Sequence, residues 1–307
     1  MTQAPELRLA LTFDAEMDAF DASFAPRESA EWRGIEDGVP LIEMVLEGVC
    51  DCDKKRAVAT WFVRCDDQIE YIAGSASYLF DRYAGLWRRR QQLGDEIAFH
   101  THLYRQESGG WSQDKEPLSL RAQILRSYSA MMDAGFSSKV SRIGEAFCTN
   151  AVMDALEECG VQIDSTAMPG RVRIDAERNL DWSMTPEHAY YPSVDNYGSP
   201  GDPARKLLEI PMSMLRTEAD YDRKPLLRYL DLSFHPRALR KGISDLVKTA
   251  EIIVAVTHPS AVLTSTIPHG LISFSADAFA ENLDSLLREC ARQERPIKFI
   301  TLAQTAY

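Results

Sequence analysis

The sequence has no long apolar run, no excess of basic residues and no regularly spaced set of cysteines. It lacks the roughly 20 consecutive apolar residues of a membrane-spanning helix, so we expect no membrane span. Lys and Arg total 34 against 46 Asp and Glu, a net charge of −12, which argues against a nucleic-acid partner because phosphates require a basic face. The composition, 45% hydrophobic and 26% charged, excludes intrinsic disorder, a coiled coil and a collagen-like fibre.

The N-terminal segment and the cysteines bear on where the protein resides. The start, MTQAPELRLALTFDAE, has no cationic stretch, and Glu6, Arg8 and Asp14 confine its apolar run. We therefore expect no signal peptide and a cytoplasmic protein. At a length of 307 residues, six cysteines indicate reduced, mostly buried thiols rather than a disulfide framework. The C-x-C pair Cys50 and Cys52 differs from the usual C-x₂-C zinc knuckle, which argues against a structural zinc there.

Short apolar runs alternate with longer segments of helical period along the whole chain. The predicted strands cover residues 7–13, 57–63, 96–99, 139–142, 161–163, 207–210, 251–257 and 297–302. The predicted helices cover residues 40–49, 77–93, 119–134, 150–159, 236–250 and 275–292. Asn150 is placed to cap a helix N-terminus, and Gly94, Gly135 and Gly160 stand where helices end.

This alternation predicts an α/β protein with a largely parallel sheet, because several strand runs are apolar on both faces. Seven or eight strand–helix units favour a barrel. Residues 165–206, rich in proline, glycine and aromatic residues, interrupt the rhythm. We therefore expect residues 1–307 to form a single barrel domain with a long loop insertion at 165–206, rather than two domains.

Chemically active residue types stand directly after several of the predicted strands. Active sites of α/β barrels gather at the carboxyl ends of the strands. The residues found at or just after these ends are Asp14, Glu16, His100, His102, Arg142, Asp164 and His258. Each alone has an ordinary explanation, such as a solvated acidic turn, a packed strand end, a salt bridge or a helix cap. Together they predict a catalytic site.

The motif His100-Thr101-His102 predicts a metal site. The chain has only 6 histidines, and side chains at i and i+2 of an extended segment point to the same side, so two imidazoles can converge on one ion. A carboxylate completes a donor set that suits zinc, and also cobalt or nickel. Asp14 and Glu16 share the same period, so one could ligate the ion while the other accepts a proton from water.

Seven short segments follow one another in an order that is more specific than any of them alone. They are TFDAE, ATWFV, DEIAFHTH, SRIGEAF, DST, LLEIP and VTHPS, which lie between Thr12 and Ser260, and the pattern they belong to runs from about Leu7 to the C-terminus. In this order they resemble the landmarks of the polysaccharide deacetylases, the NodB-homology group also called carbohydrate esterase family 4. The resemblance implies a distorted (β/α)₇ barrel that removes acetyl groups from sugars with one divalent metal.

The resemblance also implies roles for individual residues. Asp14 corresponds to the catalytic base and Arg142 to the arginine that orients this base. His258 corresponds to the histidine that protonates the leaving amine or alcohol. His100 corresponds to the first metal-binding histidine.

Two positions depart from the family pattern. The metal-binding aspartate that usually follows the base is replaced by Ala15, so the resemblance implies Glu16 as the metal ligand. The second histidine of the usual H-[ST]-x-x-H motif is replaced by Tyr104, so we expect His102 to supply the second imidazole.

The loop insertion 165–206 holds further candidates. The resemblance implies a supporting acid at Asp181, or at Asp164 just before the insertion. Trp182 and Tyr191 are candidate substrate-binding residues, because aromatic faces stack on sugar rings. The alternative is that these aromatic side chains only fix the loop to the barrel.

The predicted function is a metal-dependent hydrolase that removes an acetyl group from an N-acetylated sugar or a related small amide. Its cofactor is one divalent metal, zinc ahead of cobalt and nickel, and its partner is a glycan or small-molecule substrate. Two alternatives stay open because of the altered motifs. One is a metal-independent amidohydrolase acting on a cyclic amide or ureide, and the other is a non-catalytic barrel that binds a glycan or a partner protein. The sequence predicts no particular oligomeric state.

Overall fold

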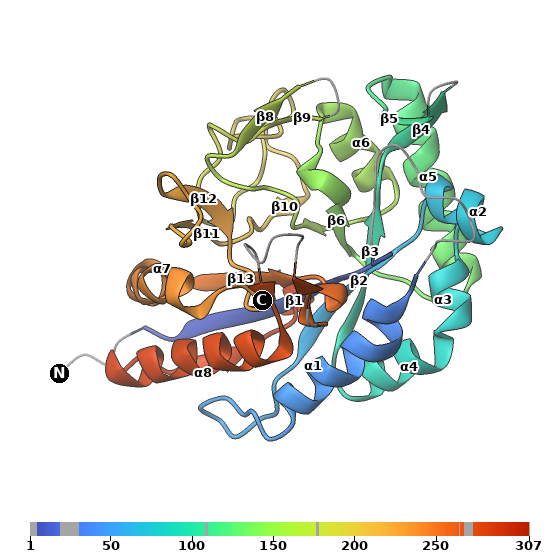
Figure 1. Cartoon of the computed structure of the whole chain (residues 1–307). Coiled ribbons are helices and arrows are strands. Elements are labelled where there is room, and N and C mark those ends of the chain that lie inside the picture. Colours follow the sequence, from blue (N-terminus) through green and yellow to red (C-terminus); the bar gives the residue numbers. More distant parts are fainter. Residues whose placement is uncertain are drawn as a thin grey trace. The chain divides into compact units, whose positions relative to one another are not determined.

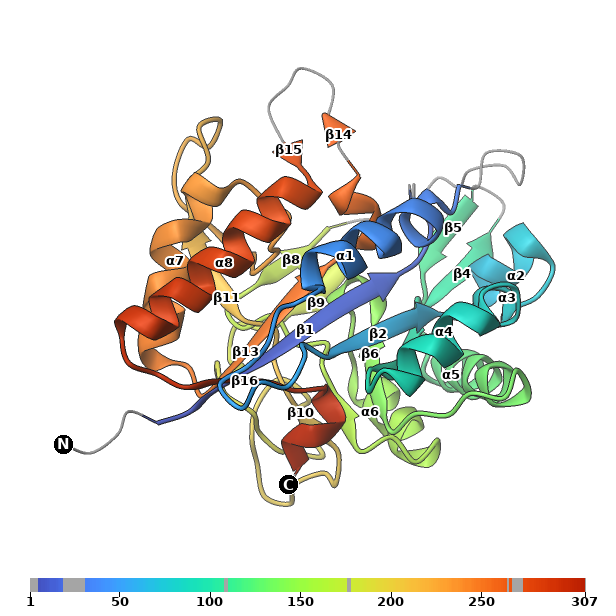
Figure 2. The same ribbon diagram turned by 90° about the horizontal axis from the view of Figure 1, so that it is seen from below.

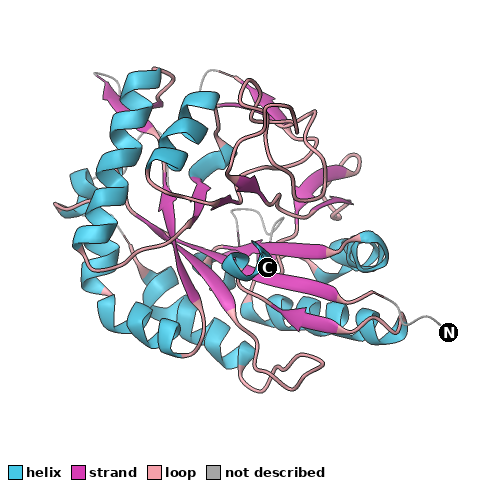
Figure 3. Cartoon of the chain, turned by 180° about the vertical axis from the view of Figure 1, so that it is seen from behind, coloured by secondary structure: helices cyan, strands magenta, loops and turns pink. Residues whose placement is uncertain are grey.

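The structure is a computed structural model, and it describes residues 5–18, 31–107, 110–175, 178–263, 265–266 and 273–306. These residues form helices, strands and the loops that join them, as Figure 3 shows. The chain divides into two compact units. The terminal unit consists of Met1–Ala15, Trp32–Thr60 and Met212–Tyr307, and the central unit of Glu16–Glu31 and Trp61–Pro211. The expectation of a single domain stays a prediction.

The terminal unit is built around strand β1 (Leu7–Ala15), which pairs in parallel with β13 (Ile252–Thr257) and β16 (Ile297–Phe299), as Figure 2 shows. Almost every residue of β1 is buried, as expected of a strand covered on both faces. The register pairs Phe13 with Thr257, so the carboxyl ends of β1 and β13 coincide. The other helices and strands of this unit are α1 (Val39–Leu46), β11 (Met214–Thr217), β12 (Leu226–Tyr229), α7 (Pro236–Thr249), β14 (Ser265–Thr266), β15 (Ser273–Phe274) and α8 (Ala276–Arg292).

The central unit contains the second, larger set of elements, beginning within β2. They are β2 (Ala59–Arg64), α2 (Asp67–Ala73), α3 (Tyr78–Arg82), α4 (Ala84–Gln92), β3 (Glu96–Thr101), β4 (Tyr104–Glu107), β5 (Gly110–Gln113), α5 (Pro117–Asp133), β6 (Val140–Ile143), α6 (Asn150–Glu158), β7 (Ile163–Asp164), β8 (Val172–Ile174), β9 (Asn179–Asp181) and β10 (Leu208–Glu209). The strand order in its sheet is β10–β7–β6–β3–β2, and the pairs from β10 to β3 are parallel. Helices α5 and α6 pack on each other, and β8 and β9 form a hairpin (Figure 1).

The predicted α/β class with parallel strand pairs is confirmed. Each of the eight predicted strands overlaps a strand of the structure, and each predicted helix overlaps a helix. The expected single helix at 77–93 is divided into α3 and α4 at Tyr83, where the backbone leaves the helical region. Gly94, Gly135 and Gly160 have positive φ angles of 91°, 81° and 81°, as helix-ending glycines do.

Two further expectations need correction, and one helix was not predicted. Thr149, not Asn150, caps α6, because its hydroxyl accepts the Val152 N–H. Helix α2 was not expected, although Asp66 caps its first turn. All six cysteines are free thiols, but Cys50 and Cys52 are exposed, so only part of the set is buried. Within the described chain, every helix is too short or too polar to cross a membrane.

Candidate metal centre

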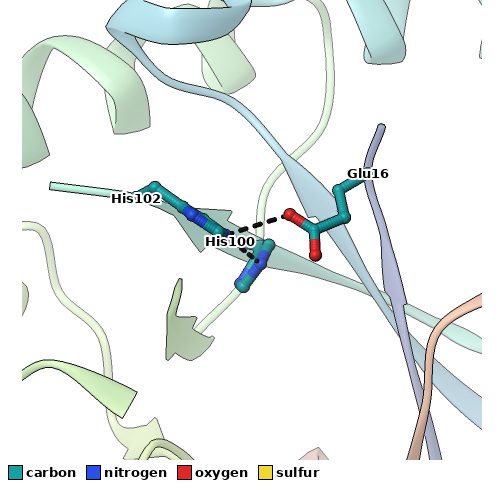
Figure 4. A group of neighbouring side chains, drawn as sticks. All are labelled: Glu16, His100 and His102. Atoms are coloured by element: carbon teal, nitrogen blue, oxygen red, sulfur yellow. Dashed lines mark hydrogen bonds and ion pairs between the residues drawn. The ribbon is translucent and has the colours of Figure 1, made fainter. Parts of the chain in front are cut away.

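The two histidines at the end of β3 and the carboxylate of Glu16 converge in the central unit. His100 Nε2 lies 3.2 Å from His102 Nε2, and His102 Nε2 lies 3.0 Å from Glu16 Oε2 (Figure 4). Both rings are almost fully buried, at 1% and 4% exposure. The i, i+2 spacing on an extended segment puts both rings on one side of β3, as the sequence predicted.

The backbone of β6 fixes the orientation of His100. Its Nδ1 lies 2.8 Å from the carbonyl oxygen of Arg142, the residue that the strand register places opposite it. A carbonyl can only accept a hydrogen bond, so Nδ1 carries the proton and donates it. In the neutral ring the Nε2 lone pair is then directed at His102 and Glu16. Histidines that bind metals are held in this way, with the second ring nitrogen donating to a backbone carbonyl or a carboxylate.

The donor set fits a divalent metal. One donor atom each of Glu16, His100 and His102 lies within 4.8 Å of the other two. Neighbouring ligand atoms around a tetrahedral zinc are separated by about 3.3 Å, since each bond is about 2.0–2.1 Å long. The separations of 3.0 and 3.2 Å are close to that value. Two imidazoles and one carboxylate are donors that zinc, cobalt and nickel accept, and such three-ligand zinc sites leave a position open.

Arg64, at the end of β2, neutralises part of this site. Its guanidinium is fully buried and bonds Asp66 Oδ2 at 2.6 Å and Glu16 Oε2 at 3.0 Å. Asp66 Oδ2 also accepts the backbone N–H of His102 at 3.0 Å. Burial alone raises the pKa of Asp66, but the nearby charges of Arg64 and His102 outweigh it and hold this pKa below its usual value. Asp66 is therefore an anion that ties β2 to the histidine segment.

Gly144, directly after β6, makes room for the His102 ring. A Cβ at this position would lie 2.1 Å from His102 Cδ2, far inside van der Waals contact. The next two residues, Glu145 and Ala146, have positive φ angles of 59° and 53°, a left-handed conformation that costs free energy in residues with a side chain. On the other side of His102, the ring of Tyr104 stacks with it at a centroid distance of 6.2 Å.

The Arg142 side chain is fixed on the neighbouring strand end. Its Nε donates to the Ser165 carbonyl at 2.8 Å and its Nη2 to the Ser165 hydroxyl at 3.2 Å. Its guanidinium carbon lies 4.1 Å from the ring centre of Phe62. Arg142 thus contributes to the site in two ways. Its carbonyl orients His100, and its guanidinium is fixed by Ser165 and Phe62. Its role in orienting the base stays a prediction.

Asp164 forms a buried acid pair with Glu209 rather than standing alone. The register of β7 and β10 places the two residues opposite each other, and both are fully buried. Ser141 donates to Asp164 at 2.5 Å, and the Ala167 N–H donates to Glu209 at 2.9 Å. Burial raises the pKa of both carboxyls, that of Glu209 well above its usual value, and for Glu209 the charge of Asp164 raises it further. Of the two carboxyls, Glu209 is the one whose pKa is raised more strongly by its surroundings.

The other two predicted catalytic residues belong to the terminal unit. Asp14 and His258 directly follow the register pair Phe13 and Thr257, so they lie at adjacent strand ends. Asp14 is 5% exposed and His258 is half-buried. Only Ala15 separates Asp14 from Glu16 in the chain.

A buried aspartate in the terminal unit was not expected. Asp231 Oδ1 accepts hydrogen bonds from the Ser233 N–H at 2.9 Å and from the Thr257 hydroxyl at 3.0 Å. Burial raises the pKa of Asp231, and these hydrogen bonds and the charge of His258 partly offset that increase. Asp231 and His258 are thus close enough to interact electrostatically.

The two predicted substrate-binding aromatic residues differ in exposure. Trp182 is fully buried, its indole N–H donates to the Ala146 carbonyl at 2.8 Å, and its ring packs edge-on against Tyr197. It has no free face for a sugar ring and instead supports the left-handed turn at Ala146. Tyr191 is 52% exposed, so its face is open. Asp181 is exposed and accepts the Ser183 N–H.

Four of the residues described above were not predicted from the sequence: Arg64, Asp66 and Glu209 in the central unit, and Asp231 in the terminal unit. For Arg64 a signal existed, because it follows the apolar run of β2 just as Arg142 ends that of β6. Asp66, two residues later, carried the pattern of a helix cap. Glu209 and Asp231 could not be found in this way, since only the strand register and burial reveal their partners.

Comparison with known proteins reveals relatives in structure alone. No family model matches the chain, and no curated protein matches it by sequence. A solved Mycobacterium smegmatis protein, provisionally assigned as a polysaccharide deacetylase, aligns over 100% of this chain and 91% of its own, with 20% identity and a TM-score of 0.55. A Parabacteroides distasonis protein, provisionally described as a glycoside hydrolase or deacetylase, aligns over 99% of this chain and 71% of its own, with 11% identity and a TM-score of 0.62. These likenesses confirm the predicted fold, the distorted (β/α)₇ barrel of polysaccharide deacetylases.

Replacing Gly144 by alanine should displace the His102 ring. Because the new Cβ overlaps the ring, we expect Gly144→Ala to lower the free energy of unfolding by about 1–3 kcal/mol, measured by urea denaturation. Gly85→Ala in α4 is the matched control, since a Cβ there meets no atom within 4 Å and alanine favours a helix. Equal stability of Gly144→Ala and the wild type would show that the ring is not confined.

The acid pair predicts a pH dependence of stability. Folding raises the pKa of Glu209 above its ordinary value of 4.5. The contribution of Glu209 to the free energy of unfolding is therefore fully present below pH 4.5, and it is lost as the pH rises through the folded-state pKa. Glu209→Gln cannot ionise and still accepts the Ala167 N–H. We expect its unfolding free energy, relative to wild type, to increase by on the order of 1–2 kcal/mol between pH 5 and 8 in urea titrations. Parallel pH profiles for the two proteins would contradict the raised pKa of Glu209.

Proposed function

We propose that this protein is a metal-dependent hydrolase that removes an acetyl group from an N-acetylated sugar or a related small amide. The observation that carries the proposal is the convergence of Glu16, His100 and His102, with the second nitrogen of His100 donating to a backbone carbonyl. This donor set, on a fold shared with a provisionally assigned polysaccharide deacetylase, supports a hydrolytic rather than a purely structural role. Zinc is the metal that the donors favour, with cobalt and nickel as alternatives.

The chain supplies the groups that such a hydrolysis needs. A divalent cation supplies Lewis acidity, which polarises a carbonyl and makes water more acidic. Asp14 acts as the general base that accepts a proton from water, and Arg142 orients it. His258 acts as the general acid that protonates the departing amine. Asp231 is proposed to support this role, because it lies close enough to His258 to interact with it electrostatically.

The substrate is a glycan or a smaller N-acetylated sugar. Tyr191 is the aromatic residue proposed to stack on a sugar ring, since half of its surface is exposed. Trp182 is left out of the binding surface because it is fully buried.

The proposal predicts about one zinc, cobalt or nickel ion per purified chain, measured by elemental analysis. His100→Ala and Glu16→Ala should lose this ion, because each removes one of three protein donors. His188→Ala is the matched control, since this histidine is exposed and lies outside the donor set, and it should retain the metal. An enzyme that hydrolyses amides without metal and is insensitive to chelators would contradict the proposal.

Replacing Asp14 by asparagine should abolish the proton-accepting step. We expect Asp14→Asn to lower kcat/KM for acetate release from N-acetylated sugars by about 100-fold or more, because an amide cannot act as a general base. Asp37→Asn, which changes an exposed carboxylate of the terminal unit, should leave the rate unchanged.

The same assay separates catalysis from binding. If the wild type releases no acetate from any acetylated sugar, while sugar binding survives in Asp14→Asn, the protein is a binding protein and the proposed reaction is wrong.

A further inference from the structure

Arg64 is a buried cation of the central unit that bonds directly to Glu16, one of the proposed metal ligands. Its side chain is 0% exposed. Its three guanidinium nitrogens bond three different residues. Nε donates to Asp66 Oδ2 at 2.6 Å, Nη1 to Glu16 Oε2 at 3.0 Å, and Nη2 to the Gln68 side-chain oxygen at 2.5 Å. Two carboxylates compensate the buried charge, and both contribute to raising the pKa of Arg64 against the effect of burial.

These bonds connect Arg64 to both segments that supply metal ligands. Glu16 is itself a proposed ligand, and its Oε2 receives Arg64 and His102 together. Asp66 Oδ2 accepts the backbone N–H of His102, while Asp66 Oδ1 caps α2. One planar guanidinium therefore determines the position of the carboxylate and, through Asp66, the position of the histidine segment.

We propose that Arg64 is a positioning residue of the metal centre, which holds Glu16 Oε2 against the histidine pair and so raises the affinity of the site for a divalent cation. The inference rests on the proposed function, because it takes Glu16, His100 and His102 as the ligands. It adds a residue at a position where neither the strand-end candidates nor the family landmarks placed one.

Two opposite effects of Arg64 must be weighed. A guanidinium 3.0 Å from a ligand oxygen repels a second cation, which lowers affinity. It also restricts the Glu16 side chain, which has 11% exposure and could otherwise turn toward solvent. The planar fork bonds three acceptors at fixed angles, which a lysine ammonium cannot do. We infer that the positioning of Glu16 outweighs the repulsion, because Glu16 Oε2 contacts both Arg64 and His102, and Asp66 connects Arg64 to the His102 backbone.

The experiment compares Co(II) binding by the wild type and by Arg64→Lys, which keeps the charge and loses the fork. Titration followed by visible absorption should show about 10–100-fold weaker binding by Arg64→Lys, the usual cost of removing a group that orients a ligand. Arg90→Lys is the matched control. Arg90 is also buried and bonds a carboxylate, Asp95, at 2.7 Å, but neither residue belongs to the donor set. Its Co(II) affinity should equal that of the wild type. Binding by Arg64→Lys as tight as, or tighter than, the wild type overturns the proposal.

A second readout needs no metal. In the metal-free protein, the NMR signals of the His102 ring report the position of Glu16, and they should shift in Arg64→Lys but not in Arg90→Lys. If the wild type binds no Co(II) while this shift occurs, the proposed function fails and the positioning of Glu16 by Arg64 stands. If the shift is absent, the positioning is wrong whatever the metal result.

Gln68→Ala covers the case in which Arg64→Lys does not fold. It removes one acceptor of the fork and keeps both ion pairs. We expect weaker Co(II) binding, in the same direction as for Arg64→Lys but smaller. Wild-type affinity in Gln68→Ala, when Arg64→Lys cannot be purified, overturns the proposal.

Discussion

The hydrogen bond from His100 Nδ1 to the Arg142 carbonyl is the interaction on which the candidate site depends. A neutral imidazole carries one proton, so committing it to a carbonyl on one side leaves a lone pair on the other. The parallel register of β3 and β6 places Arg142 opposite His100 and thereby makes this bond possible. The backbone of the sheet therefore decides which nitrogen faces Glu16 and His102.

Charge balance is the second constraint. Glu16 and Asp66 are carboxylates in or beside a buried region, and one buried guanidinium bonds both. An uncompensated buried charge destabilises the folded state. The ion pairs of Arg64 with Glu16 and Asp66 offset this cost and so allow two carboxylates to lie close to the imidazoles. On neighbouring strands, Asp164 and Glu209 lie opposite each other and are fully buried, and burial raises the pKa of both carboxyls. The carboxylates of the metal centre are thus paired with a cation, whereas the neighbouring strands bury a carboxyl whose pKa is raised.

The strands and the two metal-binding histidines could be predicted from the sequence, because short-range residue patterns determine them. The strand runs are apolar enough to be recognised, and the i, i+2 period of His100 and His102 fixes their common side. Arg64 follows the same rule at the end of β2. Glu209 does not, because its pairing with Asp164 depends on the register of strands more than forty residues apart. Trp182 shows the same limit. From the sequence, an aromatic residue in a loop is expected to be exposed, but in the structure Trp182 is fully buried and bonded to the Ala146 carbonyl.

The most direct test of the account is X-ray absorption spectroscopy of the zinc-loaded protein at the zinc edge. We predict a first shell of nitrogen and oxygen at about 2.0–2.1 Å, with the outer-shell scattering of two imidazole rings. Sulfur at about 2.3 Å would instead place the metal on cysteine thiolates and contradict the assignment of Glu16, His100 and His102 as the metal centre.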